Sequence, residues 1–123
     1  MITGTGVDIV EIHRVQTIIE RWGETFELKI LTEKERQYCN AKNNPAQHIA
    51  ARFAAKEAFA KAIATGWSGI FRWTDVEIVN EISGKPTIIL HNELKTNLTL
   101  HKIFLSISHT ENSVVAFVVI EKL

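Results

Sequence analysis

The sequence has little cysteine, no excess charge of either sign and no long apolar run. Its single cysteine, Cys39, excludes an intrachain disulfide, and the lack of a thiol cluster argues against structural zinc. Fourteen Lys and Arg residues balance fourteen Asp and Glu residues, which argues against a nucleic-acid partner or a polybasic membrane surface. Any anionic ligand therefore has to be held by a local group of cations.

Signals for export or membrane insertion are also missing. The start of the chain lacks the basic and apolar regions of a signal peptide, and no apolar run approaches the roughly 20 residues of a membrane-spanning helix. With one thiol, this pattern predicts a soluble cytoplasmic protein in a reducing compartment. The 123 residues, 46% of them hydrophobic, suit one domain spanning residues 1–123.

The chain begins with a predicted strand and an amphipathic helix. Residues 2–10 are β-rich and include Gly4 and Gly6, which predict a bulge or the close approach of another backbone. Apolar residues then recur at helical spacing from Ile12 to Trp22, and Gly23 is placed to end that helix.

Two further helices are predicted before the midpoint. Residues 32–35 have capping-box spacing, so a short helix begins there and ends near residues 43–45. Pro45 suits the first position of the next helix, which should run to about Ala64 and be the longest.

The second half of the chain changes to β-rich runs. A small helix fits within residues 91–100, and residues 83–85 and 110–113 are short enough to be hairpin turns. Since helices gather early and strands late, the prediction is an α+β fold with the long helix packed on an antiparallel sheet. The strands are expected at residues 76–79, 86–90, 103–108 and 114–120.

The last predicted strand, residues 114–120, is apolar on both faces. Such a strand is either central in its own domain and covered on two sides, or packed against another chain. Because a domain of this size with one sheet has little material to cover both faces, we favour an oligomer.

The most informative stretch is residues 52–62, which read RFAAKEAFAKA within the long helix. At ~100° per residue, Glu57 and Lys61 lie ~40° apart, flanked by Ala50 and Ala54. The small alanines would let a strand or a ligand approach the backbone beside the carboxylate. The alternative is a solvated Glu–Lys ion pair on an alanine-rich helix.

Two other groups can be considered with this helix. Asp8 at the end of the first strand is either a helix cap or a metal ligand. If Asp8 and Glu57 meet, Mg2+ would resolve their repulsion and leave positions for water and phosphate oxygens. His109, with Ser108 and Thr110 beside it, is either a turn histidine or a receiver of an anionic group.

Three motifs together resemble the holo-acyl-carrier-protein synthases, a group of 4′-phosphopantetheinyl transferases. They are GVDIVEI at residues 6–12, RFAAKEAFAKA at 52–62 and SISHT at 106–110. The resemblance implies Mg2+-dependent transfer of the 4′-phosphopantetheine arm of coenzyme A to a serine of acyl carrier protein, leaving adenosine 3′,5′-bisphosphate. It also implies a small α+β fold assembled as a homotrimer with active sites at the subunit interfaces.

The resemblance assigns catalytic roles to three residues. Asp8 and Glu57 would hold Mg2+ against the pyrophosphate, and Lys61 would donate to the same phosphates. The general base stays open between Glu57, a metal-bound water and another carboxylate, because phosphoryl transfer depends mainly on positioning and charge neutralisation.

Binding roles follow from the same motifs. Arg52 would pair with a coenzyme A phosphate, the alternative being a surface salt bridge. Arg14 would dock the acidic carrier protein, with Arg21 extending that face, the alternative being solvated helix arginines. Substrate contacts near the nucleotide are expected at Gly66, Ser108, His109 and Thr110.

The sequence departs from the family pattern at two places. Residues 64–69 read ATGWSG where relatives often have a GTGIG-like turn, so Gly66 is kept while Trp67 adds bulk. Residues 43–48 carry no full positive charge where relatives often have Lys and Arg. Either Lys42 or His48 substitutes, or the 3′-phosphate is held less tightly.

Two other classes of function are compatible with the pattern. One is a noncatalytic oligomer of this fold that binds coenzyme A or a nucleotide, and the other is a structural oligomer whose charged helix forms salt bridges. The presence of Asp8, Glu57 and Lys61 argues against the first, and the second leaves the coincidence of three motifs unexplained.

Overall fold

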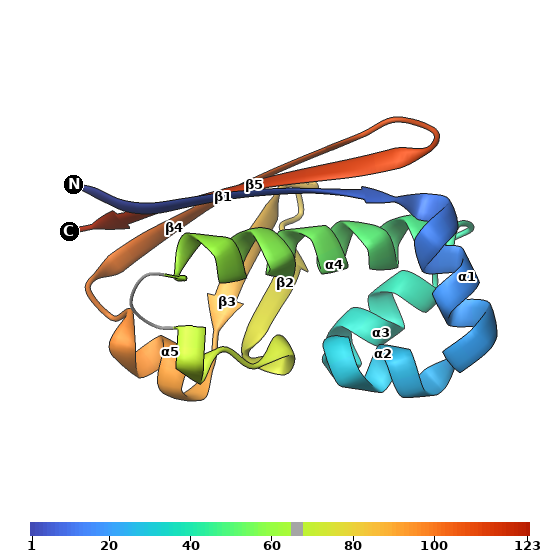
Figure 1. The fold of residues 1–123 in the computed structure, drawn as a ribbon, viewed down its shortest axis with the longest axis horizontal. Helices are drawn as coiled ribbons and strands as arrows, with labels where there is room; N and C mark the ends of the chain where they lie inside the picture. Colours follow the sequence, from blue (N-terminus) through green and yellow to red (C-terminus); the bar gives the residue numbers. More distant parts are fainter. Residues whose placement is uncertain (65–67) are drawn as a thin grey trace.

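The computed structural model describes residues 1–64 and 68–123, and it has the expected α+β architecture (Figure 1). The helices are α1 (Ile12–Trp22), α2 (Glu24–Ile30), α3 (Glu33–Asn40), α4 (Pro45–Ala62) and α5 (Asn92–Asn97), with 3₁₀ turns η1 (Ser68–Ile70) and η2 (Trp73–Asp75). The strands are β1 (Ile2–Glu11), β2 (Val76–Asn80), β3 (Pro86–Leu90), β4 (His101–His109) and β5 (Ser113–Lys122).

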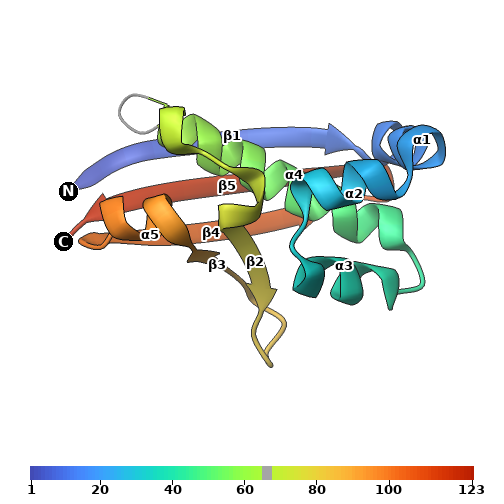
Figure 2. The same cartoon turned by 90° about the horizontal axis from the view of Figure 1, so that it is seen from below.

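The strands form two antiparallel sheets, which corrects the expectation of one. The first has the order β1-β5-β4, and the second is the β2–β3 hairpin. Figures 1 and 2 show the hairpin running across the direction of the larger sheet, so its strands do not continue the hydrogen-bond ladder along β4. The chain termini lie side by side, and Lys122 N donates to Met1 O at 2.8 Å.

Helix α4 packs on the three-stranded sheet through small residues. Gly4 and Gly6 of β1 lie directly against the helix backbone, where an added Cβ would meet the carbonyl oxygens of Ala62 and Ala58. Both alanines are buried. The prediction that small residues bring the first strand close to the long helix is therefore confirmed, and the same contact fixes the position of Asp8.

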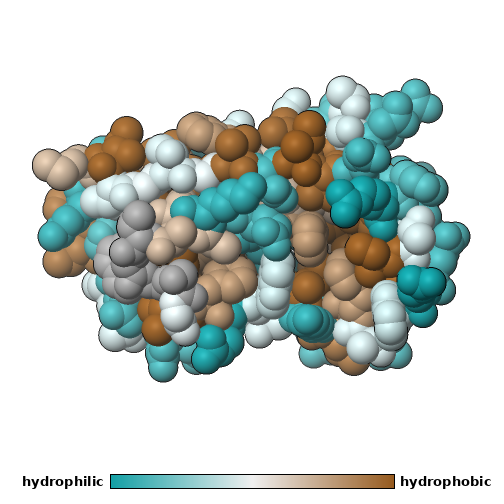
Figure 3. Space-filling view, in the orientation of Figure 1, coloured by the Kyte–Doolittle hydropathy of each residue, from teal (hydrophilic) through white to brown (hydrophobic). Residues whose placement is uncertain are grey.

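The opposite face of this sheet is uncovered in the single chain. Side chains on it remain exposed although they are apolar: Val7 53%, Ile9 70%, Phe104 44% and Phe117 45%. Figure 3 shows hydrophobic side chains gathered along the upper margin, over β1 and β5. Strand β5 is central by pairing, but only one of its faces is covered within the chain. The sequence allowed β5 either to be covered on both faces within its own domain or to pack against another chain. The first of these alternatives is wrong.

Helices α1, α2 and α3 gather beyond one end of the sheet (Figure 2). The end of α1 at Gly23 and the capping box of α3 at Thr32 are confirmed. Helix α2 was not predicted, because seven residues are too few to show a helical period. Gly23 has a φ of 53°, and this residue lets α2 begin directly after α1 in a new direction.

A buried ion pair links this helical end to α4. Lys56 and Glu35 are fully buried, with Lys56 Nζ 2.7 Å from Glu35 Oε1. The ammonium also donates to Ile30 O at 2.6 Å and Trp73 O at 2.9 Å, which uses all three of its protons. Glu35 Oε2 accepts from Ile78 N at 2.9 Å. The sequence alone suggested no role for Lys56 beyond a salt bridge. In the structure, Lys56 joins α2, α3, η2 and β2 to α4.

Candidate active site

Asp8, Glu57 and Lys61 meet where β1 passes over the C-terminal half of α4. Asp8 projects from the same side of β1 as Gly4 and Gly6, which faces the helix. Lys61 Nζ donates to Val7 O at 3.0 Å and to Asp8 Oδ1 at 3.1 Å. The lysine therefore reaches across to the strand, and the solvated Glu57–Lys61 pair considered from the sequence is not the arrangement observed.

The two carboxylates act on each other electrostatically. Burial raises the pKa of the Glu57 carboxyl, the negative charge of Asp8 raises it further, and the Lys61 ammonium opposes the shift. Asp8 and Glu57 also line one pocket of about 250 Å³. A repelling pair of carboxylates at one pocket is an arrangement that a divalent cation stabilises.

Arg14 lies in the same pocket as the carboxylates. Apolar residues of α1, α2 and α4, including Val15, Phe26 and Phe53, line other parts of this pocket. Arg21 lies two turns further along α1, and residues seven apart share a helix face. Both arginines predicted to dock a partner are exposed, and Arg14 lines the same pocket as the two carboxylates.

Arg52 and His109 line a second pocket of about 300 Å³. Arg52 is only 3% exposed, so it is not a surface residue. Its Cζ lies 4.3 Å from the centroid of the Tyr38 ring, and its Nη2 donates to Asn80 Oδ1 at 2.8 Å. Its Nε has no hydrogen-bond partner among the described residues. A buried guanidinium that lines a pocket can bind an anion there.

The three site residues predicted in the SISHT segment lie in different places: on the two opposite faces of the larger sheet and in the β4–β5 turn. Gln47 Nε2 lies 2.9 Å from His109 Nδ1, so this imidazole meets α4. Ser108 precedes it in β4 and therefore points to the opposite face of the sheet. Thr110 Oγ1 accepts from the backbone N–H groups of Asn112 and Ser113 in the hairpin turn. Within one chain, only His109 of these three shares a pocket with Arg52.

The remaining predicted site residue, Gly66, and its neighbour Trp67 lie outside the described residues. Three residues of the second pocket, Tyr38, Gln47 and Asn80, were missed by sequence reasoning. No sequence motif marks them, since they come from α3, the first turn of α4 and β2, and only folding brings these elements together.

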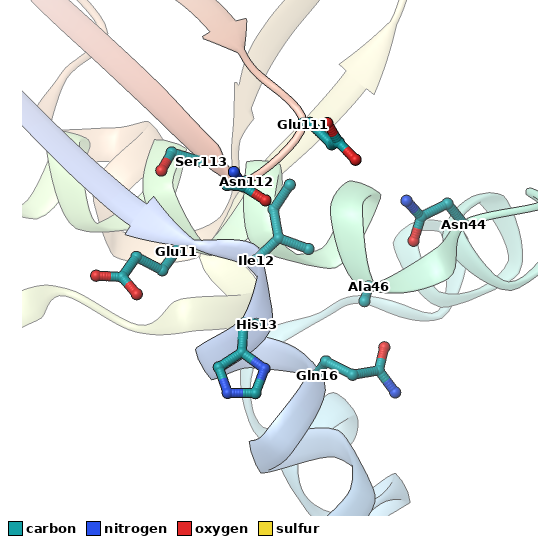
Figure 4. Close-up of a pocket in the computed structure, with 9 residues that line it drawn as sticks. All are labelled: Glu11, Ile12, His13, Gln16, Asn44, Ala46, Glu111, Asn112 and Ser113. Atoms are coloured by element: carbon teal, nitrogen blue, oxygen red, sulfur yellow. The ribbon is translucent and has the colours of Figure 1, made fainter.

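A wider depression of about 490 Å³ lies between the start of α1, the start of α4 and the β4–β5 hairpin. Figure 4 shows that Glu11, His13 and Glu111 on its rim point in different directions. It contains none of the predicted catalytic or binding residues. The pockets at Asp8 and Arg52 are therefore the better candidates for chemistry.

The family model for the 4′-phosphopantetheinyl transferase superfamily matches residues 4–118, which include all three motifs. This chain belongs to that superfamily. The resemblance predicted from the motifs is confirmed, and so is the assignment of the chain as a transferase enzyme.

Individual holo-[acyl-carrier-protein] synthases are similar to this chain over nearly their full length. The chain is 47% identical over 125 aligned residues to the holo-[acyl-carrier-protein] synthase of Geotalea daltonii, covering 99% of this chain and 100% of that one. The crystal structure of the holo-[acyl-carrier-protein] synthase from Neisseria meningitidis superposes with a TM-score of 0.91 at 38% identity, covering 99% and 100%. The Bacillus anthracis synthase, solved in complex with CoA (3′,5′-ADP), gives 0.84 at 36% identity, covering 100% and 99%.

None of the helices formed by the described residues combines the length and apolar character needed to cross a membrane.

Proposed function

We propose that this protein transfers the 4′-phosphopantetheine group of coenzyme A to a serine of an acyl carrier protein, releasing adenosine 3′,5′-bisphosphate. The observation that carries the proposal is the meeting of Asp8, Glu57 and Lys61 beside a pocket that also contains Arg14. The synthase names of relatives up to 47% identical support the same reaction.

Mg2+ fits the residues present. Asp8 and Glu57 offer hard oxygen ligands. Burial raises the pKa of the Glu57 carboxyl, the charge of Asp8 raises it further, and a cation would offset the repulsion between the two carboxylates. Among residues 1–64 and 68–123, no three His, Cys, Asp or Glu side chains converge, so the protein would leave positions free for water and phosphate oxygens. When bound, Mg2+ would offset the charge of the pyrophosphate during attack.

Lys61 would supply the second positive charge at this site. Its ammonium is held by Val7 O and Asp8 Oδ1, yet its side chain is 54% exposed. The lysine would therefore be both positioned and open to the pyrophosphate oxygens. Glu57 lines the pocket beside Asp8 and is one candidate to accept the serine proton.

The acidic carrier protein would dock on α1. Arg14 and Arg21 present two exposed charges on one helix face, and Arg14 borders the pocket of the carboxylates. A carrier held there would bring its serine next to Asp8 and Glu57.

A homotrimer would complete the active site. Asp8 and Glu57 line one pocket, while Arg52 and His109 line another, because residues 52 and 57 lie ~140° apart around α4. The uncovered apolar face of β1, β5 and β4 supports association with other copies. Coenzyme A would then lie between Asp8 and Glu57 of one copy and Arg52 and His109 of another.

We also propose a cytoplasmic location. Cys39 is free and buried, as expected for a reducing compartment.

The test mixes the protein, an apo acyl carrier protein, coenzyme A and Mg2+ and measures the intact mass of the carrier. We expect one added phosphopantetheinyl group per carrier and none after a chelator is added. A folded protein that modifies none of several carriers would instead support the noncatalytic binding oligomer.

A further inference from the structure

Lys61 neutralises one of the two carboxylates that are proposed to hold Mg2+. Its Nζ lies 3.1 Å from Asp8 Oδ1 and donates to Val7 O at 3.0 Å. Glu57 lies one turn earlier on the same helix and lines a pocket with Asp8. The ammonium of Lys61 is therefore bonded to a carboxylate that a divalent cation at this pocket would also need.

The contacts that hold this ammonium are replaceable. Val7 belongs to β1, an edge strand of the larger sheet, and it is exposed, so water can bond its carbonyl oxygen when the lysine leaves. The Lys61 side chain is more than half exposed, whereas that of Asp8 is mostly buried. An ion pair with one flexible, exposed member contributes little stability. Lys61 can thus exchange Asp8 for another anion without disturbing the fold.

Lys61 and a divalent cation would compete for Asp8. Both are attracted by the same carboxylate, and two positive charges that share it lie close enough to repel each other. Because Mg2+ binds carboxylate oxygens directly, its binding favours departure of the ammonium. A pyrophosphate at the site would offer new oxygens to which the released lysine can donate.

We propose that Lys61 is an exchangeable counter-ion, which neutralises Asp8 in the empty site and moves to the pyrophosphate of coenzyme A when Mg2+ and coenzyme A bind together. The inference rests on the metal-dependent transferase function proposed above. Without coenzyme A, the displaced ammonium gains no new anion, so Mg2+ alone binds weakly. Each ligand therefore raises the affinity for the other.

A fixed Lys61–Asp8 salt bridge would behave differently. If Lys61 stayed on Asp8 in every state, its charge would weaken Mg2+ binding by the same factor with and without coenzyme A. In the exchange that we propose, the lysine opposes the metal only when coenzyme A is absent. The two arrangements differ in the coupling between the ligands, which is the ratio of the two dissociation constants for Mg2+.

Calorimetric titration of Mg2+ into the intact protein measures this coupling. One titration uses the protein alone, another uses protein saturated with coenzyme A and no carrier, and a blank corrects for Mg2+ bound by free coenzyme A. We expect coenzyme A to tighten Mg2+ binding by about 10- to 100-fold in wild type. Lys61→Gln should bind Mg2+ alone about tenfold more tightly than wild type, and its coupling should be smaller by about the same factor.

Three further variants separate exchange from a general effect of charge. Lys61→Arg keeps a cation beside Asp8 and should bind Mg2+ alone as weakly as wild type. Arg14→Gln removes a cation that lines the same pocket and should change the two Mg2+ dissociation constants by the same factor, leaving the coupling intact. Lys95→Gln, an exposed change on α5, should behave as wild type in both titrations.

Wild-type coupling in Lys61→Gln, or weaker binding of Mg2+ alone by that variant than by wild type, would overturn the proposal. These titrations need no transfer. Lysine-dependent coupling in a protein that modifies no carrier would refute the proposed function and leave the inference standing. An active enzyme whose Lys61→Gln variant keeps the full coupling would refute the inference alone, and a protein that binds no Mg2+ in either titration would refute both.

Discussion

Lys61 Nζ lies 3.1 Å from Asp8 Oδ1 across 53 residues of sequence. The contact exists because Gly4 and Gly6 let β1 lie against the backbone of α4. In the pocket that Asp8 shares with Glu57, burial and the charge of Asp8 raise the pKa of the Glu57 carboxyl, and Lys61 opposes that shift. A strand and a helix that pack through small residues thus produce a site with two carboxylates and one ammonium.

Removing either carboxylate charge should abolish Mg2+-dependent transfer. Asp8→Asn and Glu57→Gln keep shape but remove a metal ligand, and we expect each to lower kcat/KM by about 100-fold or more. Glu20→Gln, an exposed change on α1, is the control. Near-normal rates in both site variants, measured by carrier intact mass, would exclude the two-carboxylate site.

Glu57→Gln should also stabilise the metal-free protein at neutral pH. The folded-state pKa of Glu57 is raised, so folding favours its protonated form, and stability falls as pH rises through the unfolded and then the folded pKa. The melting temperature in a chelator should therefore exceed that of wild type at pH ~7 and match it near pH ~3, below both pKa values. Added Mg2+ should stabilise wild type alone. A variant less stable than wild type at neutral pH would contradict this.

Arg14→Ala should raise the KM for the carrier protein by about tenfold while leaving coenzyme A binding unchanged, because the lost contact is with the carrier. Arg72→Ala, which removes an exposed arginine outside α1, should have little effect. Steady-state kinetics with each substrate varied in turn measure both constants. Equal loss of affinity for the two substrates would remove Arg14 from the docking role.

Lys56→Met should destabilise the protein by about 3–5 kcal/mol, because it leaves the carboxylate of Glu35 buried without its cation. Urea unfolding measures the change. The exposed Lys29→Met should alter stability by no more than about 0.5 kcal/mol. The double variant Lys56→Met, Glu35→Met should recover part of the loss. A double variant no more stable than the single one would show that the buried charge is not the cause.

Gly6→Ala should damage both stability and transfer. The added Cβ would meet the carbonyl oxygen of Ala58, so β1 must move away from α4 and carry Asp8 with it. We expect a loss of about 1–3 kcal/mol. Gly69→Ala is the matched control, since nothing lies within 4 Å of its added Cβ. Equal effects of the two substitutions on melting temperature and activity would refute the close-packing argument.

Local patterns were enough to predict many elements. The helical period from Ile12 to Trp22, the capping box at Thr32 and the position of Pro45 each depend on neighbouring residues, and their helices are confirmed. Helix α2 and the separation of β2–β3 from the larger sheet were not predicted. Both features depend on packing between segments that are distant in sequence. Such packing produces no hydrophobic periodicity within a short stretch of residues.

The sequence by itself determined the three motifs, the superfamily they indicate and the side chains available for chemistry, because these depend on residue identity and spacing along the chain. Only the tertiary structure decided which of those side chains meet. It joined Lys61 to Asp8, buried Lys56 with Glu35, and gathered Lys42, His48 and Arg52 around Tyr38. The reason is physical: each contact joins elements far apart in sequence, and its geometry is set by how α4 packs against the strands and helices around it.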